Sequence, residues 1–263
     1  MAPAGKRGIC VPWDFAEEDW PLYQGAIDAG KISWVSNWEM WKPKGLPNNV
    51  TYVPTCRTGN EANQIGDYFK GYATDHQVAD FLGFNEPDIP SQANMTVDQA
   101  VQLWKQHVLP MKAAMRGSDC KKGKVRIGSP GVSNAPQGIP FLRDFFRKLG
   151  GVDAAGVNHV SIHYYSPDVE HFKRYVTEAY EAFKRPVWVT EFACTNWNPG
   201  APVPEEAVLH FIKEALEFLD EAPFVERYSW FGAMRDVGEA VGRSNGLQVG
   251  GKLSSAGELY LSL

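Results

Sequence analysis

Hydrophobic and polar residues alternate in blocks along the whole chain, with short apolar runs separated by longer amphipathic stretches. The apolar runs are rich in β-branched and aromatic side chains, which favour a pleated and buried environment. Eight of these runs are predicted to be strands: Gly8–Trp13, Ile32–Trp38, Thr51–Thr55, Phe81–Asn85, Val125–Ser129, His159–Tyr164, Val187–Phe192 and Tyr228–Gly232.

The amphipathic stretches between these runs have the periodicity and the terminal residues of helices. Pro204 opens one of them, and Gly150 follows another, as is typical of a first turn and of a helix C-terminus. The predicted helices are Glu17–Ala29, Glu61–Tyr72, Val97–Met115, Ile139–Leu149, Val169–Phe183, Pro204–Leu219 and Ser255–Leu263.

Strands that alternate with helices indicate a parallel sheet, and eight such strands can close into a barrel. We therefore predict an α/β fold, a single (β/α)8 TIM barrel that occupies residues 1–263 as one domain. The alternative is an open doubly wound sheet, which normally has a glycine-rich phosphate-binding turn after its first strand. Residues 11–15 read Val-Pro-Trp-Asp-Phe at that point, which favours the barrel.

Length and charge agree with this fold and narrow the range of partners. The chain has 263 residues, and a barrel of this kind typically has roughly 250. Its formal net charge is -5 and no run of lysine and arginine stands out, so nucleic acids and anionic membranes are poor partners. No segment has the length and apolarity of a membrane span, and we expect a monomer.

The cysteines and histidines give no sign of a metal site. None of the four cysteines forms a Cys-x-x-Cys pair, and Cys10, Cys56 and Cys194 are predicted to be buried thiols. His159 and His163 have a spacing that a metal would accept, but the first strand offers no His-x-His to complete the set. We expect neither a metal nor a cofactor.

Two glutamates stand at the ends of predicted strands, where a parallel barrel places its active site. Glu86 follows the fourth strand and Glu191 lies near the end of the seventh. A lone glutamate at a strand end would usually form a salt bridge. Two glutamates at the mouth of one barrel favour a catalytic role instead. Alternation predicts that both point inward, each on the face of two apolar residues of its strand: Leu82 and Phe84, and Val187 and Val189.

A pair of carboxyl groups at the mouth of a barrel is suited to the cleavage of a glycosidic bond. One group must be protonated to donate to the leaving oxygen, and the other must be ionised to attack the anomeric carbon or stabilise its charge. A separation of about 5–5.5 Å leads to retention of configuration, and one of roughly 6.5–9.5 Å leads to inversion.

The sequence around these glutamates resembles a known family. Residues 83–88, Gly-Phe-Asn-Glu-Pro-Asp, contain the Asn-Glu-Pro motif of the clan A retaining barrel glycosidases. Together with residues 188–192, Trp-Val-Thr-Glu-Phe, they resemble glycoside hydrolase family 128, whose members act on β-1,3-glucan. Residues 6–8, 33–38 and 162–165 resemble its fungal members, and the likeness covers nearly the whole chain.

This resemblance implies a role for each residue of the motif. Glu86 would be the acid/base and Glu191 the nucleophile of a double-displacement reaction, and Asn85 would bind the 2-hydroxyl of the sugar. It also implies a β-1,3-glucanase, which we expect to be endo-acting and extracellular or associated with the fungal cell wall, although no signal peptide follows Met1. An exo-acting enzyme and a clan A glycosidase for β-1,4-glucan, mannan or galactan remain open.

Further residues are predicted to bind substrate from their place at or beyond strand ends. His163 and Tyr165 share a face at the end of the sixth strand, next to Glu191. Trp38, Trp197 and Trp230 are expected to stack on the apolar faces of sugar rings, with loop packing as an equal alternative for Trp197.

The remaining aromatic and acidic residues near the strand ends are assigned less directly. Trp41 is equally suited to a sugar platform and to loop packing. Glu39 is read as a solvated surface charge, with a sugar-hydroxyl contact as the alternative. Four further tryptophans are predicted to pack in or around the barrel: Trp13, Trp20, Trp34 and Trp188.

Two readings from other classes of protein are weighed against a glycosidase. A non-catalytic carbohydrate-binding barrel would usually lack one carboxylate, whereas this chain keeps both. A phosphate-binding isomerase or aldolase needs a glycine-rich loop after the last strands, for which residues 242–246 are a loose match, and in some cases a strand lysine, which is lacking.

Overall fold

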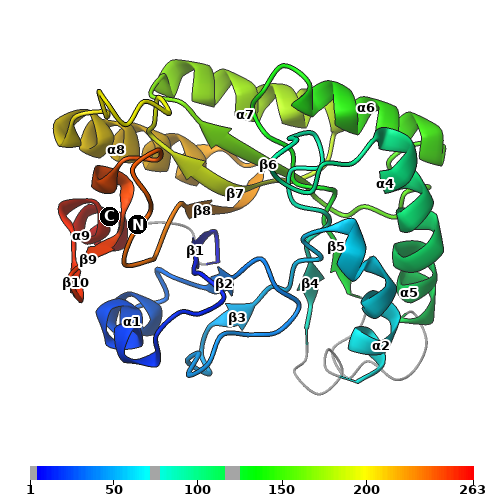
Figure 1. The fold of residues 1–263 in the computed structure, drawn as a ribbon, viewed down its shortest axis with the longest axis horizontal. Helices are drawn as coiled ribbons and strands as arrows, with labels where there is room; N and C mark the ends of the chain where they lie inside the picture. Colours follow the sequence, from blue (N-terminus) through cyan, green and yellow to red (C-terminus); the bar gives the residue numbers. More distant parts are fainter. Residues whose placement is uncertain (1–4, 72–77, 116–124) are drawn as a thin grey trace.

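Eight parallel strands form the centre of the protein (Figure 1). The computed structural model describes residues 5–71, 78–115 and 125–263. The barrel strands are β1 (Arg7–Cys10), β2 (Trp34–Ser36), β3 (Thr51–Tyr52), β4 (Asp80–Phe81), β5 (Arg126–Ile127), β6 (Val160–Tyr165), β7 (Val187–Ala193) and β8 (Val225–Trp230). All eight predicted strands are therefore confirmed, although several are shorter than the apolar runs.

Hydrogen bonds join the strands into a closed ring. Six strands form one sheet in the order β3-β2-β1-β8-β7-β6, and β4 pairs with β5. Isolated parallel bridges join these two sets of strands: Thr55 pairs with Leu82 between β3 and β4, and Gly128 pairs with His159 between β5 and β6. Backbone hydrogen bonds also cross both junctions, such as Ser129 N–H to His159 O at 3.0 Å. The predicted (β/α)8 barrel is confirmed.

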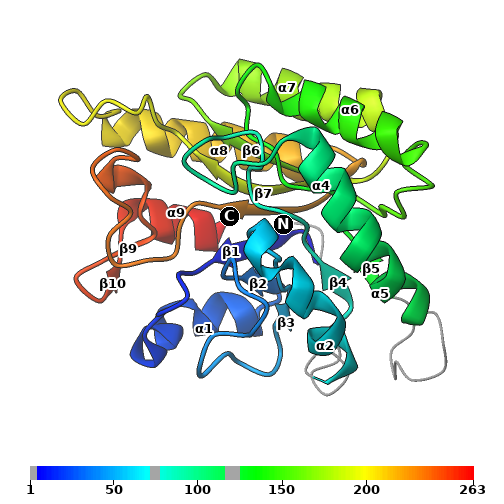
Figure 2. The ribbon, with the colours of Figure 1, turned by 45° about the vertical axis from the view of Figure 1, so that its right-hand side comes forward.

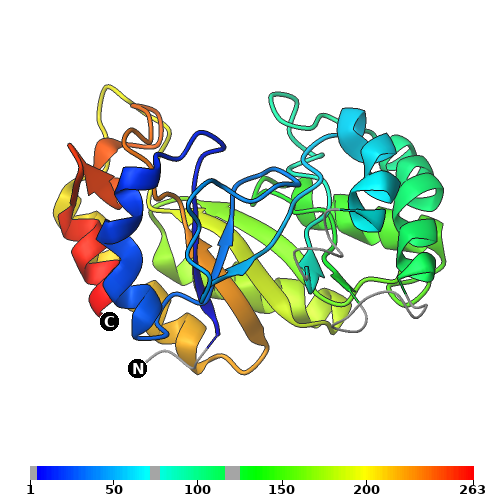
Figure 3. The same cartoon turned by 90° about the horizontal axis from the view of Figure 1, so that it is seen from below.

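Helices surround the barrel, with α6, α7 and α8 on one side and α1 and α2 on the opposite side (Figure 2). The last helix, α9, packs beside the first, α1, so the two ends of the chain close the helical layer (Figure 3). The α-helices are α1 (Trp20–Asp28), α2 (Ile65–Lys70), α4 (Val97–Leu103), α5 (Leu109–Ala114), α6 (Gly138–Leu149), α7 (Val169–Phe183), α8 (Glu205–Glu221) and α9 (Ser255–Ser262). Tyr72, the predicted end of the second helix, lies outside the described residues.

Short elements complete the layer and interrupt one predicted helix. The expected helix Val97–Met115 is divided into α4 and α5 by the π-helical turn η3 (Trp104–Val108). Pro110, in the first turn of α5, has no N–H to donate to the preceding turn, which accounts for the irregular ladder there. The other short elements are the 3-10 helices η1 (Glu17–Asp19), η2 (Gly59–Gln64) and η4 (Arg243–Asn245) and the hairpin of β9 (Gln248–Val249) and β10 (Lys252–Leu253).

The apolar core has two parts, as expected for a sheet that is covered on both faces. Trp34, Val53, Leu82 and Trp188 fill the inside of the barrel, and a larger cluster lies between the strands and the helices. Trp34 and Trp188 are completely buried with ring centroids 5.6 Å apart, so their predicted packing role is confirmed.

His159 belongs to this interior. Its ring is stacked on Trp188, with centroids 3.8 Å apart and planes 11° from parallel. Burial, with the nearby positive charges, lowers the pKa of His159 well below its usual value, so the ring is neutral. Among the described residues, no group of three or more histidines, cysteines and acids is arranged to hold a metal.

The predicted buried thiols are confirmed. Cys10, Cys56 and Cys194 are buried and free, and burial raises the pKa of each. Within the described ranges, none of the helices combines the length and apolarity needed to cross a bilayer.

Candidate active site

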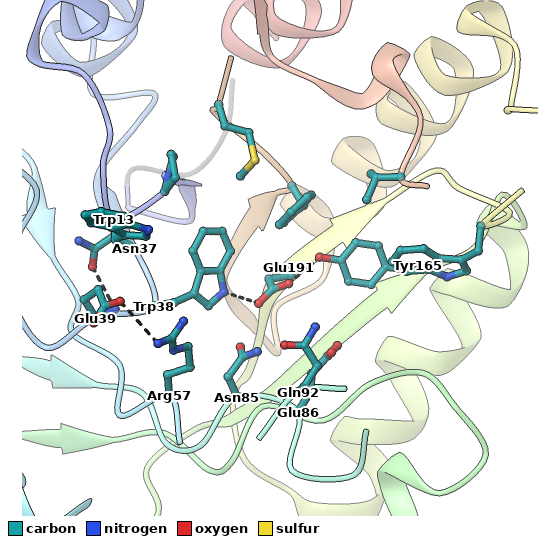
Figure 4. Close-up of a pocket in the computed structure, with 15 residues that line it drawn as sticks. Trp13, Asn37, Trp38, Glu39, Arg57, Asn85, Glu86, Gln92, Tyr165 and Glu191 are labelled. Atoms are coloured by element: carbon teal, nitrogen blue, oxygen red, sulfur yellow. Dashed lines mark hydrogen bonds and ion pairs between the residues drawn. The ribbon is translucent and has the colours of Figure 1, made fainter. Parts of the chain in front are cut away.

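A pocket of about 370 Å³ opens at the C-terminal ends of the barrel strands (Figure 4). It is lined by one residue each of β6 and β7 and by residues of the loops that follow β1, β2, β3, β4, β7 and β8. Six of the residues predicted from the sequence line it: Trp38, Asn85, Glu86, Tyr165, Glu191 and Trp197.

Glu191 reaches this pocket because β7 carries one extra residue. Val189 pairs with Ile162 of β6, and Glu191 pairs with the next residue of that strand, His163, so the register passes over Thr190. A bulge of this kind changes which side chains face the interior. Glu191 is thereby turned inward and is only 6% exposed.

The alternation predicted for β7 is therefore wrong, although the predicted position of its glutamate is correct. Trp188 points into the barrel, whereas Val187 and Val189 pack in the outer cluster against the helices. Without the bulge, a residue three positions after Trp188 would face the helices as well.

Glu86 reaches the pocket through an irregular segment after β4. Leu82 lies inside the barrel, but Phe84 faces the helices, with its ring 6.0 Å from that of Trp104. The predicted common face of Leu82, Phe84 and Glu86 is thus wrong. Glu86 itself has φ 44°, in the left-handed region, where a residue other than glycine is strained by about 1–3 kcal/mol.

Hydrogen bonds to the next strand hold this strained segment in place. The backbone N–H of Glu86 donates to Gly131 O at 2.7 Å. Asp88, two residues further on, accepts from the Ser133 hydroxyl at 2.5 Å and from the Ser133 N–H at 3.2 Å. Burial raises the pKa of the Asp88 carboxyl, and these contacts fix the loop that carries Glu86.

One imidazole ring lies between the two glutamates. Nδ1 of His163 is 2.9 Å from Oε1 of Glu86, and Nε2 is 3.5 Å from Oε1 of Glu191. The ring is 2% exposed and lies beneath the pocket. His163 and Tyr165 share one face of β6 as predicted, both approach Glu191, and His163 contacts Glu86 as well.

The charges of the three groups depend on one another. Burial alone would lower the pKa of His163, but the carboxylates of Glu191 and Glu86 outweigh it and raise this pKa to about 9. Burial raises the pKa of Glu191 and the charge of Glu86 adds to this, while His163 opposes both. Near neutral pH the ring is therefore a cation that favours the ionised form of Glu191.

Two further side chains hold the carboxylate of Glu191. The indole Nε1–H of Trp38 donates to Oε1 at 2.7 Å, and the hydroxyl of Tyr165 donates to Oε2 at 2.5 Å. Each oxygen thus has a donor, which fixes the direction of the carboxylate. Charge-assisted hydrogen bonds of this length are stronger than those between neutral groups.

Comparison with known proteins identifies the family of this pocket. Residues 13–260 match the family described as the glycosyl hydrolase catalytic core. The chain belongs to this family. A curated relative, alkali-sensitive linkage protein 1 of Schizosaccharomyces pombe, is 30% identical over 262 residues. Those residues are 98% of this chain and 45% of the relative, so the chain spans less than half of the relative's length.

Solved structures are similar to this glycoside hydrolase along its whole length. One is a curdlan-specific exo-β-1,3-glucanase of family 128, subgroup III, from Blastomyces gilchristii, with 29% identity, a TM-score of 0.77 and 100% coverage of both chains. Another is a subgroup I endo-β-1,3-glucanase from Amycolatopsis mediterranei in complex with laminaritriose, with 25% identity and a TM-score of 0.75 over 98% and 99%. The resemblance to family 128 is thereby confirmed.

Aromatic residues form the walls of the glycoside hydrolase pocket, but they are not all those predicted. Trp197 lines it and is 52% exposed, as a platform for sugar would be. Trp13 also lines it and is 67% exposed, so its prediction as a packing residue is wrong. Trp13 stands just beyond β1, at a strand end, which was the signal available in the sequence. Trp20 is buried, as predicted, and Trp41 is half-exposed but outside this pocket.

Trp230 does not reach the pocket of the glycoside hydrolase. It is completely buried, its ring is 5.1 Å from that of Phe192, and its Nε1–H donates to Asn245 O at 2.7 Å. The predicted substrate contact is therefore incorrect, because this position of β8 faces the helices. Phe231, the next residue, lines the pocket instead.

Polar residues also line the pocket, and one of them differs from its prediction. Asn85 is 8% exposed and lines the pocket beside Glu86, where the motif places it. Glu39, expected to be a solvated surface charge, is also only 8% exposed and lines the same pocket together with Arg57. The solvated reading of Glu39 is thus wrong.

Proposed function

We propose that this chain is a retaining β-1,3-glucanase that cleaves within the glucan chain. The observation that carries the proposal is the pair of carboxylates, Glu86 and Glu191, on either side of one buried imidazole at the mouth of the barrel. The likeness to family 128 enzymes that act on β-1,3-glucan supports the choice of substrate.

In the proposed first step, the Glu191 carboxylate attacks the anomeric carbon while Glu86 donates a proton to the leaving glycosidic oxygen. The sugar is then bound to Glu191 as an ester, and the freed chain end leaves. In the second step, Glu86 removes a proton from water, which attacks the same carbon and releases Glu191. Two inversions give net retention.

Trp38, Tyr165 and His163 favour the role of Glu191 as the nucleophile. Two hydrogen-bond donors, Trp38 and Tyr165, and the nearby His163 cation stabilise the ionised form of Glu191, which is the form that attacks. They also fix its direction before substrate arrives, so less reorganisation is needed in the transition state. Asn85, which lines the pocket beside Glu86, is placed to bind a hydroxyl of the reacting sugar.

The surroundings of the pocket support internal cleavage. A cavity of about 410 Å³ adjoins it on the β4 side and shares Gln92 with it. A second cavity of about 310 Å³ adjoins it on the β1 and β8 side and shares Pro12 and Met234. We propose that these three hollows hold consecutive parts of a glucan chain that extends on both sides of the cleavage point.

An exo-acting β-1,3-glucanase is the second candidate. It is favoured by the likeness to the exo-acting enzyme from Blastomyces gilchristii at 29% identity. An exo enzyme needs one closed end in its groove, whereas a groove that runs through both flanking cavities would have none. We further propose that the protein works as a monomer outside the cell or at the cell wall, where its polymeric substrate is found.

Product analysis on laminarin, with carboxymethyl-cellulose, mannan and galactan in parallel, tests the proposal. Early release of mixed oligosaccharides from laminarin alone is the expected result. Glucose or a single short product from the start would favour the exo mode. Activity on another polysaccharide alone would reject the substrate, and binding of laminarin without any cleavage would favour a non-catalytic barrel.

A further inference from the structure

Glu39 is a buried carboxylate that the proposed reaction does not use. It follows Trp38 at the end of β2, and its side chain is 10% exposed. Burial raises the pKa of this carboxyl, while the charge of Arg57 opposes the rise. An ionised carboxylate can accept about four hydrogen bonds, and burying one without partners is costly.

The partners of the Glu39 side chain are few among the described residues. Its single ion pair is with Nη2 of Arg57 at 3.9 Å, which is too long for a hydrogen bond. Arg57 is also 3.6 Å from Glu61, again beyond a good hydrogen bond. Both groups therefore keep hydrogen-bonding capacity that faces the pocket they line.

The main chain holds Glu39 in this position. Its carbonyl accepts from the Tyr52 hydroxyl at 2.6 Å and from the Thr55 N–H at 2.9 Å. Its own N–H donates to Asn37 Oδ1 at 3.2 Å. A carboxylate on a fixed backbone loses little freedom when a ligand binds, so its hydrogen bonds to a ligand would be worth more.

The pair lies apart from the cleavage point. In Figure 4 the ring of Trp38 stands between the two groups and Glu191, and Trp13 and Asn37 lie on the same side of the pocket as the pair. Trp13 offers an exposed aromatic face. A carboxylate, a guanidinium and an aromatic face can together bind a neutral hexose.

We propose that Glu39, Arg57 and Trp13 form a subsite for one glucosyl unit of the chain, away from the scissile bond. The carboxylate accepts from two neighbouring hydroxyls, the guanidinium donates to a third oxygen, and the indole covers the apolar face of the ring. The inference rests on the proposed function, because it assumes a glucan in the groove. The opposite charges of the pair favour a neutral sugar over an anionic one.

Chain-length dependence tests this subsite. The value of kcat/KM is measured on laminari-oligosaccharides from two to six units for the wild type and for Glu39→Gln. Losing charge-assisted hydrogen bonds predicts a loss of about 10–100-fold on the long oligosaccharides, with little change on those too short to reach the subsite. An equal loss at every length, or no loss, would overturn the proposal.

A second variant and a double variant locate the effect. Arg57→Gln should show the same length dependence, and the double variant should lose less than the product of the two single losses, because both groups bind one unit. Simple multiplication of the losses would reject a shared subsite. Glu181→Gln on the outer face of α7, where Glu181 pairs with Lys184, is the control for a change of carboxylate to amide.

Binding measurements separate this inference from the proposed function. Affinity for laminarihexaose is measured in a Glu191→Ala background, with and without Glu39→Gln, and thermal unfolding verifies the fold of each variant. If Glu39→Gln impairs folding, the shorter Glu39→Asp replaces it. A wild type that neither binds nor cleaves the oligosaccharides would defeat the proposed function. Cleavage that is unaffected by the Glu39 variants would defeat only the subsite.

Discussion

The indole Nε1–H of Trp38 donates a hydrogen bond of 2.7 Å to Oε1 of Glu191. The sequence indicated this tryptophan as a stacking surface, but in the structure its polar edge is directed at the carboxylate. Its ring still lines the pocket, 5.7 Å from the ring of Phe231. The same residue can therefore shape the pocket and fix the direction of the proposed nucleophile.

Trp38→Phe should keep the apolar ring and remove the donor. A hydrogen bond to a charged group contributes about 1.5–3 kcal/mol, so we expect kcat to fall by roughly 10–100-fold with a smaller change in KM. Steady-state kinetics on laminarin measure both values. Trp41→Phe, outside the pocket, is the matched control, and a purely KM effect in Trp38→Phe would show that stacking is its main role.

Glu191→Ala should lose nearly all turnover and keep the fold and oligosaccharide binding. Azide can then enter the space left by the carboxylate and attack an activated glycoside from the same side. We expect partial recovery of activity and an α-glycosyl azide, of inverted configuration, identified by NMR. Turnover close to the wild type would reject Glu191 as the nucleophile.

Glu86→Ala should impair natural glucan far more than substrates with good leaving groups. A leaving group that is stable as an anion needs no proton, so the loss of a general acid matters less. The comparison is kcat/KM on laminarin and on an aryl β-glycoside with an acidic phenol. If both substrates lose activity equally, Glu86 is not the general acid.

His163 should make the stability of the fold depend on pH in the alkaline range. Its pKa is raised to about 9 in the folded protein, from about 6.5 in an unfolded chain. The stabilisation is then complete below pH 6.5 and is lost as the pH rises through 9. The difference in free energy of unfolding between wild type and His163→Gln should shrink over this range, and a growing difference would contradict the assignment.

Gly131 leaves room for the His163 ring. A β-carbon at this position would lie 2.9 Å from Nε2 of His163, so Gly131→Ala must displace the ring or the strand end. Overpacking of this kind costs about 1–3 kcal/mol, and we expect kcat/KM to fall about tenfold or more. Gly66→Ala in α2, where a β-carbon meets nothing within 4 Å, should leave activity unchanged. Equal activity of both variants would show that the ring tolerates movement.

The sequence was sufficient for the architecture and for the family. Eight apolar runs predicted the eight strands because most positions in these runs are buried, so the runs can be recognised without tertiary information. The Asn-Glu-Pro motif indicated Glu86, and the position of Glu191 at the end of β7 indicated its partner. Parity within β6 correctly placed His163 and Tyr165 on one face.

The sequence was insufficient wherever the backbone departs from regular geometry. The bulge at Thr190 and the left-handed φ of Glu86 change the direction of side chains without changing the pattern of residue types. Parity therefore failed at both strands that carry the glutamates. Trp230 was predicted to contact substrate and is buried, whereas Trp13 was predicted to pack and is exposed at the pocket. At a strand end, a difference of one residue decides whether a side chain lies in the core or in the pocket.

The bulge in β7 has a consequence for protein engineering. Before the bulge, the side chains of β7 alternate as barrel packing requires. After it, the alternation is shifted so that Glu191 faces the pocket, and the extra residue, Thr190, makes both arrangements possible in one strand. Deleting this one residue would leave every proposed catalytic side chain in the sequence and still rotate Glu191 toward the helices. A transplant of this active site into another barrel must therefore carry the inserted residue along with the two glutamates.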